Sequence, residues 1–231
     1  MAKLHSILMS DRPGRPSPWR EASLNSFRAV HDDMALTVYS DEALRQLVAD
    51  DFDRDVLWAY DHCDGASKAC LGRYCLLFRY GGIYSDPGLM FVAPVLRSVD
   101  SELHAFRSAD ANAYDVSVSL IAAPADLPLF EKCIRKFVRL TRNHDGDLGS
   151  AGPRLFGETI AFCDSPSTPF IAWGEELRLP SRAGVVRHAY KSASGNFVAI
   201  RQMRGDNPLK DAADTDSADV DALLSLLDGW I

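Results

Sequence analysis

Asp86 and Arg73 are the residues of this chain whose type and position are best suited to chemistry. Asp86 follows a short β-rich run at residues 83–85, and Pro87 after it favours extended backbone and lacks an amide donor, so a strand is expected to end there. In open α/β sheets, ligands bind just beyond the carboxyl ends of strands. Arg73 stands among largely apolar neighbours, and a buried guanidinium needs an anion or a carboxylate partner.

Two purely structural interpretations of these residues stay open. Asp86, Pro87 and Gly88 are all common turn residues, so the segment could be a turn without a ligand. The partner of Arg73 could be Asp86 itself, in a salt bridge that only orients the carboxylate.

A buried helix and a glycine stop must deliver Asp86 to its place. Leu71, Tyr74, Cys75 and Phe78 follow the i, i+3, i+4, i+7 spacing of a helix packed on a core. Gly81 and Gly82 can end that helix, because glycine adopts the left-handed conformation without a Cβ clash. The same two glycines could also let the backbone approach a ligand closely.

The flanking segments predict an α/β domain. An expected strand at residues 4–9 precedes a helix from Pro18 to Val30, and an expected strand at residues 36–39 precedes a helix capped by Ser40 or Asp41. This alternation implies parallel strands with helical crossovers, as in a Rossmann-like domain. Further expected elements are a buried strand at 116–121, helices at 127–140 and 154–162, and late strands around 177–179 and 185–186.

The composition limits the classes of function. The 231 residues suffice for one substantial domain, and a formal charge of −7 argues against nucleic acid as a partner. The five cysteines form no zinc spacing, and no apolar run approaches the roughly 18 residues of a membrane span. With no signal peptide evident, we expect reduced thiols and a cytoplasmic location.

Ten positions in the run of residues 68–86 match one family pattern: Lys68, Ala69, Arg73, Tyr74, Leu77, Tyr80, Gly81, Gly82, Tyr84 and Asp86. The run resembles the DXD sugar-binding region of nucleotide-sugar glycosyltransferases of the initiating-mannosyltransferase type, and more distantly that of the large clostridial glucosylating toxins. Weaker similarities before and after this run extend the resemblance over about residues 3–205. Cys70 and Gly88 depart from the pattern, since the family has Asp at both positions.

The resemblance implies a GT-A-like fold in residues 1–205, with a mostly parallel sheet flanked by helices. It implies transfer of a sugar from a UDP- or GDP-sugar to a glycan, lipid or small-molecule hydroxyl, with retention of configuration. A role in surface polysaccharide or glycolipid synthesis is expected. Because the motif is degenerate, the alternative is a non-catalytic module that binds sugar or nucleotide sugar.

The resemblance also assigns roles to individual residues. Asp86 would hold a divalent Mn or Mg ion on the donor diphosphate, and Arg73 would contact the donor. Tyr84, Gly81 and Gly82 would lie along the donor, although Tyr84 could equally pack in the sheet. His188 would be a late metal ligand and Lys191 a phosphate contact, with a structural histidine as the alternative.

Residues 206–231 form a separate segment. The stretch at 206–221 is acidic and rich in small residues, which predicts a linker, and the leucines and tryptophan of 219–231 predict a short helix. That helix could dock on the core, mediate a homo-oligomer or contact a membrane surface. An interaction protein is therefore a third possible class.

Overall fold

The computed structural model describes residues 3–9, 18–96, 102–108, 116–143, 152–162, 171–179 and 185–204. The expected tail at 206–231 and most of the glycine-rich loop before residue 152 lie outside these ranges.

The strands are β1 (Lys3–Ile7), β2 (Ala35–Tyr39), β3 (Gly82–Ser85), β4 (Leu89–Phe91), β5 (Leu103–Ser108), β6 (Val116–Ala123), β7 (Ile171–Leu179), β8 (Val185–Lys191) and β9 (Phe197–Arg204). The helices are α1 (Pro18–Val30), α2 (Asp41–Asp51), α3 (Arg54–Asp61), α4 (Gly65–Tyr80), α5 (Pro128–Asn143) and α6 (Pro153–Ala161). Every element expected within the described ranges is present, although β7 and β8 are longer than the predicted strands around 177–179 and 185–186. The elements α3, β4, β5 and β9 were not predicted.

The described strands form one sheet in the order β2-β1-β3-β6-β5-β7-β8-β9-β4. Parallel pairing is found for β1 with β2, β1 with β3, and β5 with β7. The other neighbours pair antiparallel. The expectation of a mostly parallel sheet is therefore wrong. A short turn at residues 192–196 joins β8 to β9 as antiparallel neighbours, and the pairs of β3 with β6 and of β4 with β9 form between strands distant in the sequence.

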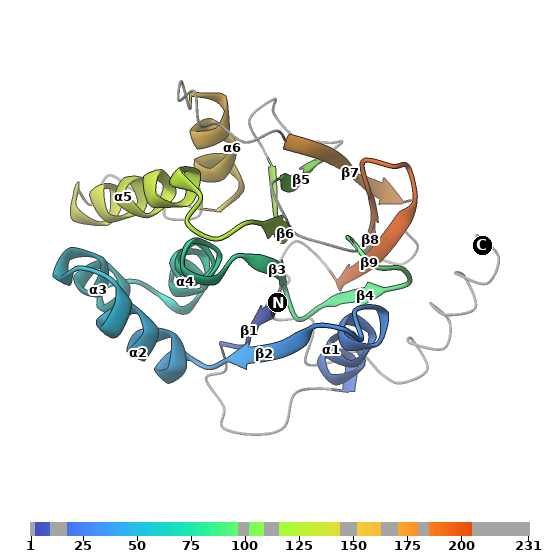
Figure 1. Cartoon of the computed structure of the whole chain (residues 1–231), viewed down its shortest axis with the longest axis horizontal. Coiled ribbons are helices and arrows are strands. Elements are labelled where there is room, and N and C mark those ends of the chain that lie inside the picture. The colour runs from blue at the N-terminus through green and yellow to red at the C-terminus, as the bar shows by residue number, and fades with distance from the viewer. Residues whose placement is uncertain are drawn as a thin grey trace.

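The sheet curls into a half-barrel (Figure 1). Strand β4 follows β3 after only three residues, yet β4 pairs with β9 at the opposite end of the strand order. The turn of Asp86, Pro87 and Gly88 thus joins the parallel and the antiparallel parts. This connection brings β9, about 115 residues further along the chain, next to Asp86.

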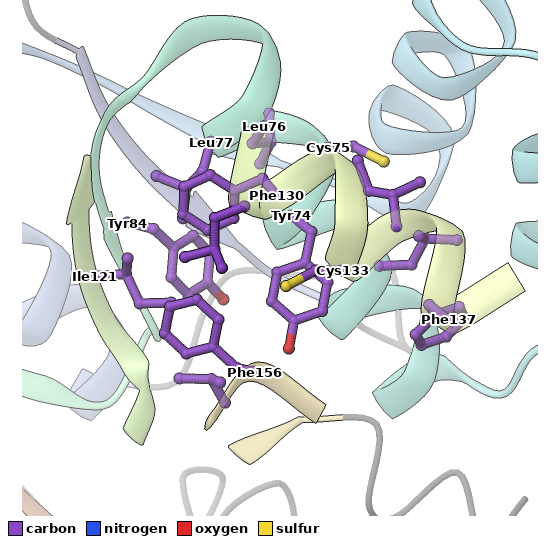
Figure 2. Packing of buried hydrophobic residues seen from close by; sticks show 14 of the residues in the cluster. Tyr74, Cys75, Leu76, Leu77, Tyr84, Ile121, Phe130, Cys133, Phe137 and Phe156 are labelled. Carbon is purple, nitrogen blue, oxygen red and sulfur yellow. The ribbon is translucent and has the colours of Figure 1, made fainter. Parts of the chain in front are cut away.

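The main core lies between helices α2 to α6 and one face of strands β1, β3, β5 and β6 (Figure 2). The rings of Tyr74, Phe130 and Phe156 stack there, with centroids 6.0 to 6.4 Å apart. The Tyr74 hydroxyl donates to the Gly152 carbonyl at 3.1 Å, which ties α4 to the start of α6. Burying this much aromatic surface fixes the position of α4, and with it the position of Arg73.

The glycine stop after α4 has the predicted conformation. Gly81 and Gly82 have φ values of +61° and +94°. A Cβ on Gly82 would lie 2.1 Å from the Lys3 carbonyl oxygen of the neighbouring strand. His5 on β1 supports the same junction, since its Nε2 lies 2.9 Å from the Gly81 carbonyl oxygen. Glycine is therefore required here by both φ and space.

Candidate functional site

A cavity of about 210 Å³ opens at the carboxyl ends of β1 and β3, between α1 and α4. Its charged lining comes from Arg20, Arg73, Asp86 and Arg201. Trp19 and Met9 contribute to an apolar wall. The cavity thus lies at the end of a strand, where the sequence predicted a ligand site.

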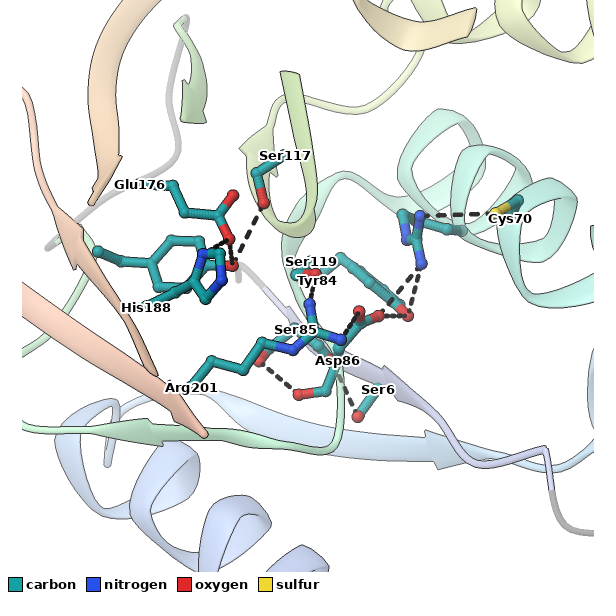
Figure 3. Close-up of polar contacts among 12 residues, drawn as sticks. Ser6, Cys70, Tyr84, Ser85, Asp86, Ser117, Ser119, Glu176, His188 and Arg201 are labelled. Carbon is teal, nitrogen blue, oxygen red and sulfur yellow. Dashed lines mark hydrogen bonds and ion pairs between the residues drawn. The ribbon is translucent and has the colours of Figure 1, made fainter. Parts of the chain in front are cut away.

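Arg73, Tyr84 and Asp86 form a connected group in this cavity (Figure 3). Asp86 Oδ1 accepts from the Tyr84 hydroxyl at 2.7 Å and from Arg73 Nη2 at 3.1 Å. The Arg73 guanidinium also lies 4.6 Å from the centre of the Tyr84 ring. Arg73 and Asp86 therefore form the salt bridge that the sequence offered as one alternative.

Burial sets the charge states within this group. It would lower the pKa of Arg73, but Tyr84 and Asp86 outweigh it and hold that pKa well above its usual value. Burial, with Asp86 close by, raises the pKa of Tyr84. The site therefore combines a cation with a neutral phenol that donates to the carboxylate.

Arg201 is a second cation on Asp86, and the sequence analysis missed it. Its Nη1 donates to Ser119 Oγ at 2.5 Å, and its Nη2 lies 3.9 Å from Asp86 Oδ2. The Asp86 amide donates to the Ser119 carbonyl at 2.8 Å, so Ser119 of β6 bonds to both Asp86 and Arg201. A lone arginine after the apolar run 197–200 is the signal that could have marked it.

His188 lies opposite Arg201 in the pairing of β8 with β9. Its Nδ1 is 3.0 Å from Oε1 of the buried Glu176, which also accepts from the Tyr190 hydroxyl at 2.8 Å. Burial would raise the pKa of Glu176, but contacts with His188 and Tyr190 lower it overall. The structure therefore places the predicted late histidine against Glu176, and Arg201 stands between it and Asp86 (Figure 3).

The remaining predicted site residues differ in whether they line the cavity. Tyr84 lines the cavity, while Gly81 and Gly82 shape the backbone behind it. Lys191 has its Nζ 5.8 Å from the centre of the Phe197 ring and does not line this cavity. Cys70 does line the cavity, and burial raises the pKa of its thiol, which disfavours the reactive thiolate.

The donor set around Asp86 does not fit a divalent cation well. Asp86 is the only carboxylate in the described lining, and both of its oxygens already face guanidinium groups. Gly88 offers no side chain. Among the described residues, no group of three or more His, Cys, Asp or Glu side chains is placed to hold a metal. Metal binding by Asp86 and His188 stays a prediction that a titration must test.

Comparisons with known proteins identify a likeness of fold. No protein-family model and no curated protein sequence matches the chain. A solved structure named PaToxG glycosyltransferase superposes with a TM-score of 0.54 at 16% identity, over 68% of each chain. At that identity the likeness concerns the fold. Among the described residues, no helix combines the length and apolar character needed to cross a bilayer. The chain has a glycosyltransferase-like α/β fold.

Proposed function

We propose that this protein is a glycosyltransferase that binds a nucleotide-sugar donor in the cavity at Asp86. The observation that carries the proposal is the group of Arg73, Tyr84 and Asp86 at the carboxyl end of β3, inside a cavity. The likeness of fold to a solved glycosyltransferase supports it. So does the match of residues 68–86 to the sugar-binding region of such enzymes.

Each group has a task in the proposed reaction. When the anomeric C–O bond breaks, negative charge grows on the departing diphosphate, and a guanidinium fixed beforehand stabilises that charge at little reorganisation cost. Arg73 is fixed in this way by Tyr84 and Asp86. The outer face of the Asp86 carboxylate can accept hydrogen bonds from sugar hydroxyls. The Trp19 wall offers apolar surface to the sugar or the base.

The finer features of the proposal come from the resemblance of residues 68–86. It favours a UDP- or GDP-sugar donor, retention of configuration, and a glycan, lipid or small-molecule acceptor. A role in surface polysaccharide or glycolipid synthesis belongs to the same proposal. A metal-assisted version would use Asp86 and His188 as ligands, although the donor set around Asp86 does not favour it.

A second candidate function is a non-catalytic nucleotide-sugar binder. The observation that favours it is the loss of two carboxylates from the sugar-binding region, at Cys70 and Gly88. Such a module would bind the same donor and leave its glycosidic bond intact.

Donor hydrolysis across a panel of UDP- and GDP-sugars tests the proposal. Release of nucleoside diphosphate should be measurable with at least one donor, and Asp86→Asn should lower it by about 10²-fold or more, as expected when a preorganised polar group is lost. Asp61→Asn is the matched control, since Asp61 pairs with Arg45 on the surface. Anomer analysis of the released sugar reports retention or inversion.

Three outcomes separate the candidates. Turnover that falls in Asp86→Asn and persists in Asp61→Asn supports the transferase. A donor that binds without any turnover supports the binding module. Equal turnover in the folded Asp86→Asn protein contradicts the assignment of the site.

A further inference from the structure

We propose that Arg73 and Arg201 bind a diphosphate directly, so that the cavity takes the diphosphate of its ligand without a bridging divalent cation. This inference rests on the site of the proposed function. It assigns Arg201 a role in ligand binding that the sequence did not indicate.

The first argument is the balance of charge in the cavity. Its described lining carries three arginines, Arg20, Arg73 and Arg201, against one carboxylate, Asp86. The whole chain has a formal charge of −7, so the described lining of the cavity is positive within an acidic protein. A positive, partly enclosed site favours a multiply charged anion and disfavours a second cation.

The second argument is the unused bonding capacity of buried Arg73. Its side chain is 5% exposed, and its Nε has no hydrogen-bond partner among the described residues. Within the same ranges, Nη1 contacts only the Cys70 sulfur, at 4.0 Å, and Nη2 donates to both Tyr84 and Asp86. A buried N–H without a partner is costly, and a phosphate oxygen would relieve that cost.

The third argument is the way the two arginines share Asp86. Arg73 contacts Oδ1 at 3.1 Å, and Arg201 lies 3.9 Å from Oδ2, beyond hydrogen-bond distance. One negative charge thus lies between two guanidinium groups. Glu176 also acts on Arg201 and helps to raise its pKa, but it is held by His188 and Tyr190 and does not line the cavity. Within the described lining, Arg73 and Arg201 therefore share the single carboxylate of Asp86.

These features match a diphosphate better than other anions. Guanidinium groups bind phosphate oxygens in a bidentate manner, and two of them held on either side of one carboxylate can each engage one phosphate. The cavity, at about 210 Å³, is smaller than the range of about 300 to 1,000 Å³ typical of whole-ligand pockets. It suits a small charged portion of a ligand.

Calorimetric titrations with inorganic pyrophosphate, UDP and GDP test the proposal. Each is run in excess EDTA, and the two nucleotides are run again with saturating Mn²⁺. We expect pyrophosphate and at least one nucleotide to bind in EDTA, with a nucleotide Kd that Mn²⁺ changes by no more than about twofold. Binding should weaken as salt rises, since the interaction is between charges.

Variants locate the binding. Arg201→Gln should weaken the binding of pyrophosphate in EDTA by about tenfold or more, because a charge-assisted contact is lost. Arg201→Lys should recover part of the affinity, since it keeps the charge but loses the planar fork. Arg79→Gln is the control, because Arg79 pairs with Asp51 at the surface and should leave affinity unchanged. Arg201 is chosen over Arg73 because removing Arg73 would leave Tyr84 and Asp86 without their buried cation.

The outcomes separate this inference from the proposed function. Nucleotide binding that requires Mn²⁺ overturns direct arginine binding and leaves the transferase standing. Pyrophosphate that binds in EDTA while no nucleotide sugar binds or turns over supports the diphosphate site and removes the transferase. Absence of binding in both buffers, or equal losses in Arg201→Gln and Arg79→Gln, overturns the inference.

Discussion

Replacing Asp86 by Asn should destabilise the protein through two buried guanidinium groups. The amide keeps an oxygen at Oδ1, so Tyr84 and Arg73 retain an acceptor. The negative charge between Arg73 and Arg201 disappears, and their mutual repulsion is no longer offset. Because the Arg73 side chain is only 5% exposed, water can take over this role only in part.

The structure bounds the size of the effect. Hydrogen bonds to a charged group contribute about 1.5–3 kcal/mol and neutral ones about 0.5–1.5 kcal/mol, so two weakened contacts cost about 2 kcal/mol. Breaking a fully buried ion pair costs about 3–5 kcal/mol, which is an upper bound here. The Asp86 side chain is 21% exposed, so solvent reduces the penalty. We therefore expect the free energy of unfolding to fall by about 2–3 kcal/mol.

Urea unfolding at neutral pH, followed by circular dichroism, measures the change. With a slope of about 2 kcal/mol per molar urea, the midpoint should fall by about 1 M. Asp61→Asn is the control, because its partner Arg45 is half exposed, and its cost should stay below about 1 kcal/mol. Equal losses in the two variants, or no loss in Asp86→Asn, would refute the view that Asp86 neutralises a buried arginine pair.

Three further predictions concern the surrounding structure. Gly82→Ala should lower the free energy of unfolding by at least about 2 kcal/mol in the same urea assay, since the φ of Gly82 is +94° and a Cβ would meet the Lys3 backbone. Gly88→Ala, in open space, should change this free energy by less than about 0.5 kcal/mol. Similar losses in the two variants would contradict this account. Burial lowers the pKa of His5 from 6.5 to about 4, so between these pH values the unfolded chain binds a proton that the folded protein does not. The free energy of unfolding should therefore fall as pH drops from 6.5 towards 4, by up to about 3 kcal/mol from this residue. His5→Gln should reduce this dependence of the free energy of unfolding on pH, and His62→Gln, at an exposed position, should not. An unchanged pH dependence in both variants would refute the role of buried His5. Gly88→Asp adds a second carboxylate where space allows, so Mn²⁺ affinity should rise by about tenfold by calorimetry. No gain in a folded variant would mean that the turn does not bring the two carboxylates onto one cation.

Local patterns were enough to predict the segment that carries Asp86. The apolar stripe of α4, the glycine pair and the short strand β3 are each determined by interactions between close neighbours in the chain. The parallel pairing of β1 with β2 followed from the strand and helix alternation. Because α4 and β3 are adjacent in sequence, the contact between Arg73 and Asp86 could also be anticipated.

The antiparallel half of the sheet could not be predicted in the same way. β4, for example, has only three residues, too few to show an alternating pattern. Which strand each one pairs with depends on contacts across the whole chain. The sequence interpretation therefore extended the parallel pattern of the first half to strands that pair the other way.

The sequence by itself determined the helix, the glycine stop and the carboxylate at the strand end, since these depend on local backbone preferences and on a buried arginine's need for an anion. Only the tertiary structure decided which groups surround that carboxylate. The curl of the sheet brings Arg201 of β9 to Asp86 and turns His188 towards Glu176. These contacts arise because strands distant in sequence pair with one another, and such pairing leaves no local signature in the residues themselves.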